Sequence, residues 1–349
     1  MCLNWIIWWL KTFISDSVSP SPSPFKKSLV GHPSLSDFIP TIRSGAWADI
    51  GFRSRMEDAY VCVDNFAQDF GLENTSGGPN AFYGVFDGHG GKHAADFAGC
   101  HLLRFILEDE EFPQEIERVI SSAYLRTDAA FAKACSLDAD LASGTTALTV
   151  IIMGRLLVVA NTGDCRAVLC RQGKAIEMST DHKPMHARER RRIEASGGCI
   201  SSDGYLNGEL NVARALGDWH LEGLKIMCEN IELGPLIAEP ELVSANLTED
   251  DEFLIIGCDG IWEVFLSQNA VDFARRRLQE HNDPSLCSKE LVDEALKRKS
   301  SDNLSAVIIC FQQHRPQNLI SPPSRARRRF SAQGLMDLQS LLDSSGGEQ

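Results

Sequence analysis

Short runs of apolar and β-branched residues recur through the middle of the chain and limit the folds that it can adopt. The runs cover residues Thr145–Met153, Leu156–Ala160, Arg166–Cys170, Phe253–Cys258 and Leu304–Phe311. Runs of this length and composition predict β-strands, several of them buried on both faces. Turn-forming pairs such as Gly154-Arg155 and Gln172-Gly173 separate neighbouring runs, so we expect the strands to pair in antiparallel fashion.

Two other segments have the three- and four-residue apolar spacing of amphipathic helices. One runs from Ile116 to Ala134 and the other from Ser285 to Lys299. Strands that pair with their sequence neighbours, with helices packed outside them, predict an α+β fold.

Composition supports a folded chain with a sizeable core. Of the 349 residues, 43% are hydrophobic and 23% are charged, which excludes a wholly disordered, collagen-like or coiled-coil chain. Lys and Arg number 34 against 48 Asp and Glu, for a formal net charge of −14. Because nucleic-acid affinity comes mainly from basic side chains on phosphates, we expect no nucleic-acid partner.

The 11 cysteines are an odd number and form no Cys-x-x-Cys pair. A disulfide framework or a zinc site is therefore unsupported, and a reducing compartment, cytoplasm or nucleus, is expected. Cys258 and Cys310 lie inside apolar runs and are interpreted as small buried hydrophobic residues.

Residues 1–44 are interpreted as an apolar segment and a Ser/Pro-rich linker that precede the folded domain. The stretch Met1–Leu10 is shorter than the ~20 residues that span a bilayer, and it lacks the basic leading region of a secretory signal. A loosely attached tail is expected, with contact between its tryptophans and a membrane surface as the alternative. The repeat Ser19–Pro24 predicts a stiff solvated linker.

Residues 45–313 are expected to form the folded domain, and residues 314–349 a basic tail. The tail contains Arg325, Arg327, Arg328 and Arg329 without an intervening acid. A solvated tail is the simplest interpretation, and a nuclear-import signal or a kinase site at Ser331 are the alternatives.

Acidic residues at the ends of the apolar runs carry most of the chemical information. Asp87-Gly88 and Asp259-Gly260 each follow such a run, whereas Asp302 and Glu57 precede one. Each acid taken alone could simply open a turn. Together, at one mouth of a sheet, they are the oxygen ligands that hard divalent cations prefer, and four carboxylates balance two such ions.

These acids belong to motifs that occur in one order along residues 46–312. The motifs are Gly51-Phe52-Arg53-Ser54-Arg55-Met56-Glu57-Asp58, Val85-Phe86-Asp87-Gly88-His89-Gly90-Gly91, Ser143-Gly144-Thr145-Thr146-Ala147, Asn161-Thr162-Gly163-Asp164-Cys165-Arg166, Asp181-His182-Lys183-Pro184, Glu194-Ala195-Ser196-Gly197-Gly198, Ala213-Arg214-Ala215-Leu216-Gly217-Asp218, Cys258-Asp259-Gly260-Ile261-Trp262 and Ser301-Asp302-Asn303. In this the chain resembles the plant type 2C metal-dependent protein serine/threonine phosphatases, the PPM-type phosphatases. The resemblance implies a central sandwich of two antiparallel β-sheets flanked by α-helices, with a binuclear metal site at one end.

The resemblance also implies a role for each acid. Asp87 would bridge two Mg²⁺ or Mn²⁺ ions, Asp259 and Asp302 would complete one site, and Glu57 with the Gly88 carbonyl would complete the other. Asp58 would orient its neighbours from behind.

Hydrolysis of phosphoserine and phosphothreonine by metal-activated water, without a covalent enzyme intermediate, is the implied reaction. His89 is the candidate acid for the leaving alkoxide, and Arg53 the candidate for gripping the phosphate. A weaker third metal site is implied at Asp164 and Asp259, where Glu263 replaces the expected aspartate, so we expect reduced third-metal binding.

Phosphorylated proteins, kinases and other signalling proteins among them, are the expected partners of a monomeric enzyme. The stretch from Gly198 to Pro240 resembles the family's flap beside the cleft, and Trp219 within it is interpreted as a packing residue. Two alternatives remain: a catalytically weak scaffold of the same fold that binds phosphoproteins, and a calcium-binding module. The scattering of the acids along the chain disfavours the calcium module.

Overall fold

The computed structural model describes residues 38–72, 76–228, 231–232 and 234–318. The chain divides into two compact units, Met1–Pro316 and Gln317–Gln349, and the strands and helices of the described part all belong to the first. Of the predicted N-terminal segment and linker (residues 1–44), residues 1–37 lie outside the described residues, as do the arginine cluster and Ser331. The predicted boundary at residue 44 is slightly late, because Arg43 and Ser44 already belong to the strand Arg43–Asp49. Among the described helices, none has the length and apolar character needed to cross a membrane.

The first of two large sheets contains both ends of the folded region. Its five strands follow the order β1 (Arg43–Asp49), β15 (Leu304–Cys310), β14 (Asp251–Gly257), β8 (Arg166–Arg171) and β9 (Lys174–Glu177). All neighbours in it are antiparallel. The predicted turn Gln172-Gly173 joins β8 to β9, and both of its residues have positive φ, 48° and 73°, which suits a two-residue hairpin.

The second large sheet also has five antiparallel strands. Their order is β13 (Glu241–Asn246), β7 (Leu156–Thr162), β6 (Ala147–Met153), β3 (Asn80–Phe86) and β2 (Ala59–Val63). The predicted turn Gly154-Arg155 joins β6 to β7. The expected antiparallel pairing is therefore confirmed in both sheets.

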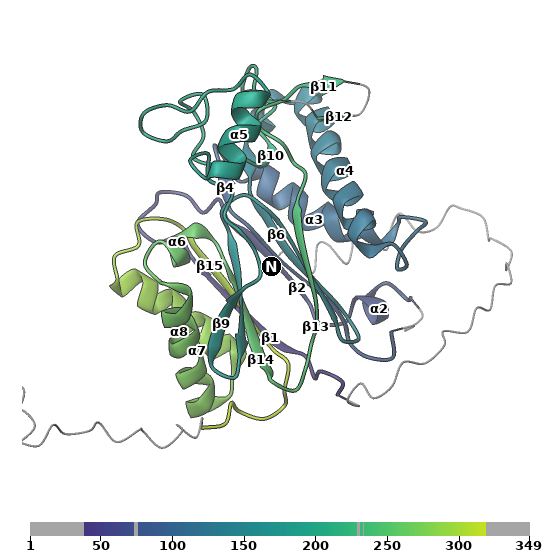
Figure 1. Ribbon diagram of the computed structural model, residues 1–349, viewed down its shortest axis with the longest axis vertical. Coiled ribbons are helices and arrows are strands. Elements are labelled where there is room, and N and C mark those ends of the chain that lie inside the picture. The colour runs from purple at the N-terminus through teal and green to yellow at the C-terminus, as the bar shows by residue number, and fades with distance from the viewer. Residues whose placement is uncertain (1–37, 73–75, 229–230, 233, 319–349) are drawn as a thin grey trace, which may run out of the picture. The chain divides into compact units, whose positions relative to one another are not determined.

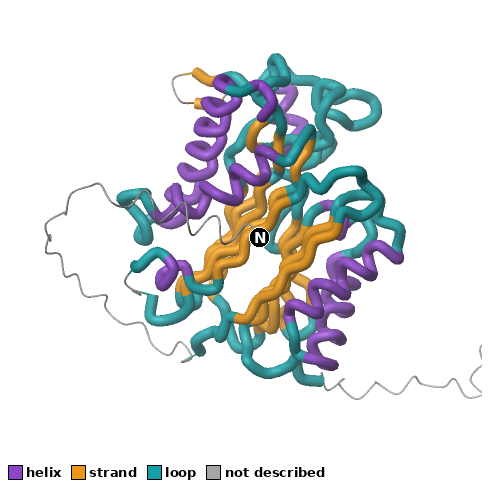
Figure 2. The backbone as a smooth tube through the Cα atoms, turned by 180° about the vertical axis from the view of Figure 1, so that it is seen from behind, coloured by secondary structure: helices purple, strands orange, loops and turns teal. Residues whose placement is uncertain are grey.

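The main hydrophobic core lies between the two sheets, and helices cover their outer faces (Figure 1). Helices α7 (Ser267–His281) and α8 (Pro284–Lys297) lie on the first sheet, and α3 (His93–Leu107) and α4 (Ile116–Leu137) on the second. Figure 2 shows the two groups of strands as separate layers with helices outside them. Strands covered on both faces are wholly buried, as β3 and β15 are, which is why their sequences are mostly apolar, with Asn80 and Ser305 as the exceptions.

Smaller elements complete the unit. They are α2 (Phe66–Asp69), β4 (Gly88–His89), the 3₁₀ helix η1 (Ala139–Leu141), β5 (Gly144–Thr145), α5 (Ala187–Ala195), β10 (Leu216–Gly217), β11 (Met227–Cys228), β12 (Ile231–Glu232) and α6 (Asp259–Trp262). Strands β10, β5 and β4 form a three-stranded sheet, which joins the flap (residues 198–240) to the chain after Asp87. A separate apolar cluster that includes Ile193 of α5 supports the flap from within.

The structure corrects some predicted boundaries. The run Thr145–Met153 is not one strand, because Thr146 leaves the ladder to bond the backbone of Asp87, dividing the run into β5 and β6. The second predicted helix begins one residue earlier, at Pro284, because the Asp283 carboxylate caps it by accepting from the N–H groups of Ser285 and Leu286.

Candidate functional site

A polar cleft of about 380 Å³ opens where several strands of both sheets end. Its lining is Arg53, Ser54, Arg55, Glu57, Asp87, Gly88, His89, Gly90, Thr146, Asp164, Tyr205, Glu209, Leu210, Asn211, Val212, Asp259, Asp302 and Asn303. The structure thus brings together every predicted primary ligand, the candidate acid, the candidate phosphate-gripping arginine and Asp164. Residues of the flap, Tyr205 and residues 209–212, also line the cleft, so the predicted position of the flap beside the cleft is confirmed.

Asp87 lies directly after β3, and its backbone is fixed from two sides. Its carbonyl accepts hydrogen bonds from the Thr146 N–H at 2.9 Å and the Thr145 hydroxyl at 3.1 Å. Its own N–H donates to the Thr146 hydroxyl at 3.1 Å. Burial, followed by the nearby carboxylates of Asp58 and Asp259, raises the pKa of Asp87 well above its ordinary value. An isolated carboxylate here is therefore strongly disfavoured in its charged form.

Asp259 opens α6, immediately after β14 and Cys258. One carboxylate oxygen each from Asp87, Asp164 and Asp259 lies within 4.8 Å of the others. The Oδ1 atom of Asp259 is buried and has no hydrogen-bond partner. Burial and the charge of Asp164 raise the pKa of Asp259 to about 7. The charge of Lys183 lowers the pKa of Asp259 but does not offset these effects, so among the described residues the carboxylate remains in a condition that a bound cation would relieve.

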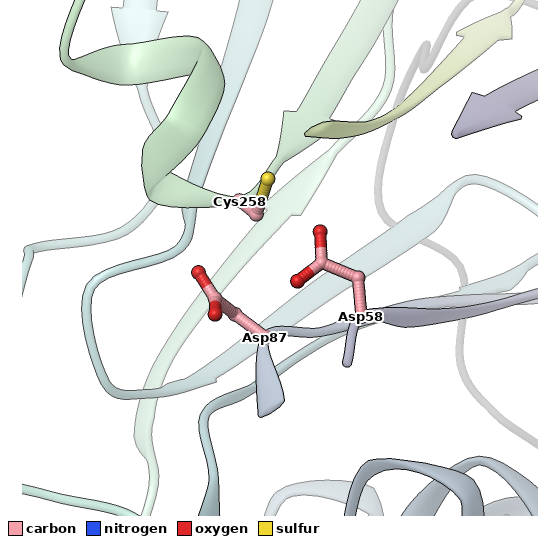
Figure 3. Close-up of side chains that lie close together, drawn as sticks. All are labelled: Asp58, Asp87 and Cys258. Carbon is pink, nitrogen blue, oxygen red and sulfur yellow. The ribbon is translucent and has the colours of Figure 1, made fainter. Parts of the chain in front are cut away.

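Asp58, Asp87 and Cys258 form a second group whose ligand atoms lie within 4.8 Å of one another. Figure 3 shows the carboxyl groups of Asp58 and Asp87 pointing into the same space, with Cys258 beside them at the start of α6. Burial raises the pKa of Asp58 to about 6, and its Oδ2 atom also lacks a partner. Asp58 is not among the residues that line the cleft, so it lies behind the predicted ligands.

Glu57 and Asp302 approach the cleft from opposite ends of the sequence, and Asn303 joins their segments. The Asn303 side chain accepts from the Glu57 N–H at 2.8 Å and donates to the carbonyls of Ile50 and Arg55 at 2.8 and 3.0 Å. Gly88 lies against the same segment, since a Cβ at Gly88 would sit 2.3 Å from the Glu57 carbonyl oxygen. Only glycine allows the two chains to approach this closely.

Arg53 donates to the Asp302 carboxylate at 2.7 Å and to the Ser301 carbonyl at 3.3 Å. Its side chain is otherwise well exposed at the mouth of the cleft, at 57%. The structure therefore places the candidate phosphate-gripping group directly beside a predicted metal ligand, within reach of an incoming anion.

His89 pairs with an aspartate that the sequence interpretation did not single out. Its Nε2 atom lies 2.8 Å from Oδ2 of Asp218, whose side chain is only 1% exposed. Burial lowers the pKa of His89, but the Asp218 carboxylate more than offsets this and leaves the pKa raised. A Cβ at Gly144 would lie 2.2 Å from His89 Nε2 and from both Asp218 oxygens, so the pair packs directly on that glycine.

The predicted third-metal residues are brought together only partly. Asp164 lies in the cleft, where its Oδ2 accepts a hydrogen bond from the Lys183 ammonium. Glu263 is exposed at the end of α6 and is not among the cleft-lining residues. The pairing of Asp164 with a lysine was not predicted.

Asp218, Asn303 and Lys183 are thus site residues that the sequence interpretation left without a role. Each one stands inside a motif that was recognised, Gly217-Asp218, Asp302-Asn303 and His182-Lys183 respectively. A signal was therefore present, but pairings such as that of His89 with Asp218 span 129 residues and appear only in the fold.

The residues present fit a divalent cation. The donors are carboxylate oxygens, and two of them, on Asp58 and Asp259, are buried without a hydrogen-bond partner among the described residues. A two-sheet sandwich with such a carboxylate cluster at one end, a paired histidine and an exposed arginine is the arrangement expected of a metal-dependent phosphatase from the sequence resemblance.

Comparisons with known proteins agree with this class. The family model for protein phosphatase 2C matches residues 43–304, and the chain belongs to that family. It is 66% identical over 337 residues to "Probable protein phosphatase 2C 22" of Arabidopsis thaliana, covering 97% of this chain and 84% of that one. It is 62% identical over 333 residues to "Probable protein phosphatase 2C 57" of Oryza sativa subsp. japonica, covering 95% and 89%.

The fold is also that of solved phosphatase structures. The crystal structure of serine-threonine phosphatase 2C from Toxoplasma gondii aligns with a TM-score of 0.61 at 22% identity, covering 78% of this chain and 97% of that one. The predicted fold class is confirmed, and the chain is a metal-dependent protein serine/threonine phosphatase that acts on phosphoproteins. The scaffold alternative is not favoured.

Proposed function

We propose that this phosphatase uses two Mg²⁺ or Mn²⁺ ions, held by Glu57, Asp87, Asp259, Asp302 and the Gly88 carbonyl. The observation that carries the proposal is the convergence of these carboxylates in one cleft, with the Asp259 Oδ1 atom buried and unpartnered. Asp87 would bridge the ions, with Asp259 and Asp302 on one side and Glu57 with Gly88 on the other. When bound, the ions supply an activated water and neutralise charge on the phosphate.

The remaining residues bind and orient the substrate. Arg53, whose guanidinium is a planar fork, would hold phosphate oxygens while keeping Asp302 as its neighbour. Asp58 would keep Asp87 in place from behind. Because a serine or threonine alkoxide leaves poorly, a proton must reach the leaving oxygen as its bond to phosphorus breaks. His89, which lines the cleft, would donate this proton.

A third, weaker metal site at Asp164 and Asp259 remains part of the proposal, with Glu263 reducing its occupancy. What supports the reduction is the Lys183 ammonium on Asp164, which already balances that charge, together with the exposed position of Glu263. The compartment, cytoplasm or nucleus, and the monomeric state are proposed from the sequence alone. Fluorescent fusion and light scattering test these two points.

Hydrolysis of a phosphothreonine peptide tests the proposed function. Phosphate release should require Mg²⁺ or Mn²⁺, stop on chelation, and recover when the ion is restored. Asp87→Asn should abolish release while the protein stays folded, because it removes the bridging charge. Phosphate release that survives thorough chelation would refute the two-metal proposal.

A further inference from the structure

A buried carboxylate on α4, outside the cleft lining, contacts the segment that carries the partner of His89. Oδ1 of Asp128 accepts from the Gly217 N–H at 2.6 Å and from the Trp219 indole N–H at 3.2 Å. Oδ2 of Asp128 accepts from the Lys225 ammonium at 2.6 Å. The side chains of Asp128 and Lys225 are 3% and 1% exposed. A buried ion pair with this many partners is weak evidence for stability, so a different role must be considered.

Asp218 lies between the two residues that Asp128 binds. Its φ of 59° is in the left-handed region, which aspartate adopts infrequently, and Gly217 before it has a φ of 82°. Its N–H donates to the Ser143 carbonyl at 2.9 Å. Local sequence alone does not impose this backbone conformation, so contacts from outside the segment must hold it.

Lys225 makes further contacts with the segment on either side of Asp218. Besides pairing with Asp128, its ammonium donates to the Ala215 carbonyl at 2.9 Å and lies 5.0 Å from the centre of the Trp219 ring. Contacts with Asp128 and Lys225 therefore bracket Asp218 on both sides, while its own carboxylate reaches His89 at 2.8 Å. These contacts connect Asp128 on α4, through Asp218, to the imidazole ring of His89 at the cleft.

We propose that Asp128 and Lys225 are positioning residues for proton donation, because they fix the Asp218 carboxylate against Nε2 of His89. The inference rests on the proposed function, in which His89 protonates the leaving oxygen. As the phosphorus–oxygen bond breaks, its electron pair passes to the serine or threonine oxygen, and a proton from His89 completes the hydroxyl. With Nε2 held by Asp218, the imidazole ring keeps one orientation toward the cleft.

Comparing two leaving groups tests the proposal. A phosphothreonine peptide releases an alkoxide that needs a proton, whereas p-nitrophenyl phosphate releases a phenolate that leaves without one. General acids contribute about 10²–10⁴-fold, so we expect Asp128→Ala, which misplaces the acid without removing it, to lower the peptide kcat by about 10-fold or more. The kcat for p-nitrophenyl phosphate and both KM values should change little.

Matched variants separate positioning from folding. Asp128→Ala leaves the Lys225 charge buried without a carboxylate beside it, although the Ala215 carbonyl still accepts from the ammonium. The double variant Asp128→Asn/Lys225→Met removes both charges and keeps an oxygen for the Gly217 N–H. It should regain stability relative to Asp128→Ala but keep part of the selective loss, because the Lys225 contact with the Ala215 carbonyl is gone. Glu252→Gln serves as the control, because Glu252 forms a mostly buried ion pair with Arg275, at 2.6 and 2.9 Å, at the end of β14 remote from Asp259. It should leave the ratio of the two kcat values unchanged.

Equal losses with both substrates in Asp128→Ala would overturn the inference and indicate a purely structural pair. His89→Asn distinguishes the two levels of the proposal: if it too shows no selectivity, the acid role of His89 fails. If His89→Asn is selective and Asp128→Ala is not, only the positioning role fails. Trp219→Phe removes a single 3.2 Å bond, so it keeps the test available if the Asp128 variants do not fold. An unchanged kcat ratio in that case counts against the proposal.

Discussion

Replacing Asp259 with asparagine should stabilise the metal-free protein while it destroys the metal site. Burial and the charge of Asp164 raise the pKa of Asp259 to about 7, whereas an unfolded aspartate has its ordinary value of 3.8. Above pH 4 the unfolded chain therefore binds fewer protons than the folded one, and stability falls as the pH rises until it levels off near pH 7. Each pKa unit is worth about 1.4 kcal/mol, so the penalty approaches roughly 4 kcal/mol at pH 8.

Asparagine cannot ionise, so Asp259→Asn removes this penalty. In chelator at pH 8, the melting temperature of the variant should exceed that of the wild type by on the order of 10 °C, and the difference should shrink toward pH 4. Saturating Mg²⁺ or Mn²⁺ should reverse the order, because ions that bind only the folded wild type stabilise it. Thermal unfolding followed by circular dichroism, from pH 4 to 8, measures both effects.

Asp302→Asn is the matched control. The carboxylate of Asp302 pairs with the exposed Arg53, and such surface pairs contribute about 0–1 kcal/mol. This variant should gain much less stability in chelator than Asp259→Asn, because Asp302 is only a minor contributor to the raised pKa of Asp259. If Asp259→Asn is less stable than the wild type in chelator at pH 8, the buried carboxylate is not under electrostatic strain, and the reasoning is wrong.

Three further substitutions test individual contacts of the site. Gly144→Ala places a methyl group 2.2 Å from His89 Nε2, so kcat for a phosphothreonine peptide should fall about 10-fold or more. Overpacking should also lower the free energy of unfolding by about 1–3 kcal/mol. Gly99→Ala is the control, because its Cβ meets nothing closer than 3.4 Å, and it should leave kcat unchanged. Asn303→Ala breaks three hydrogen bonds that join the two ends of the domain, so chemical denaturation should show the free energy of unfolding falling by about 1–3 kcal/mol. A smaller decrease would show that water replaces these bonds. Glu263→Asp should make Mn²⁺ activate the enzyme more strongly, and superimposable activation curves for the two proteins would refute a role for Glu263 at a third site.

Local pattern was sufficient to predict much of the fold. The apolar runs from Leu156 and from Leu304 became β7 and β15, because strands covered on both faces need continuous apolar sequence. The order of strands in each sheet was not predictable in the same way. β1 pairs with β15 across more than 250 residues, and no local signal specifies that partner.

The same limit applies to the site. Glycine-flanked acids such as Asp87 and Asp259 were recognisable, because carboxylates at strand ends have a chemical reason to be there. The groups that orient them depend on contacts between distant segments, as Asp218 does on His89 and Asp128. Thr146 illustrates the point: its sequence fits a continuous strand, yet its bonds to Asp87 interrupt that strand at the cleft.

Equilibrium Mn²⁺ binding, measured beside phosphate release on the same samples, tests the central claim most directly. We expect two ions per chain in the wild type, with phosphate release rising as the sites fill, and loss of both binding and release in Asp87→Asn. Unchanged binding in a folded Asp87→Asn protein, or phosphate release by a wild-type chain shown to hold no ion, would contradict it.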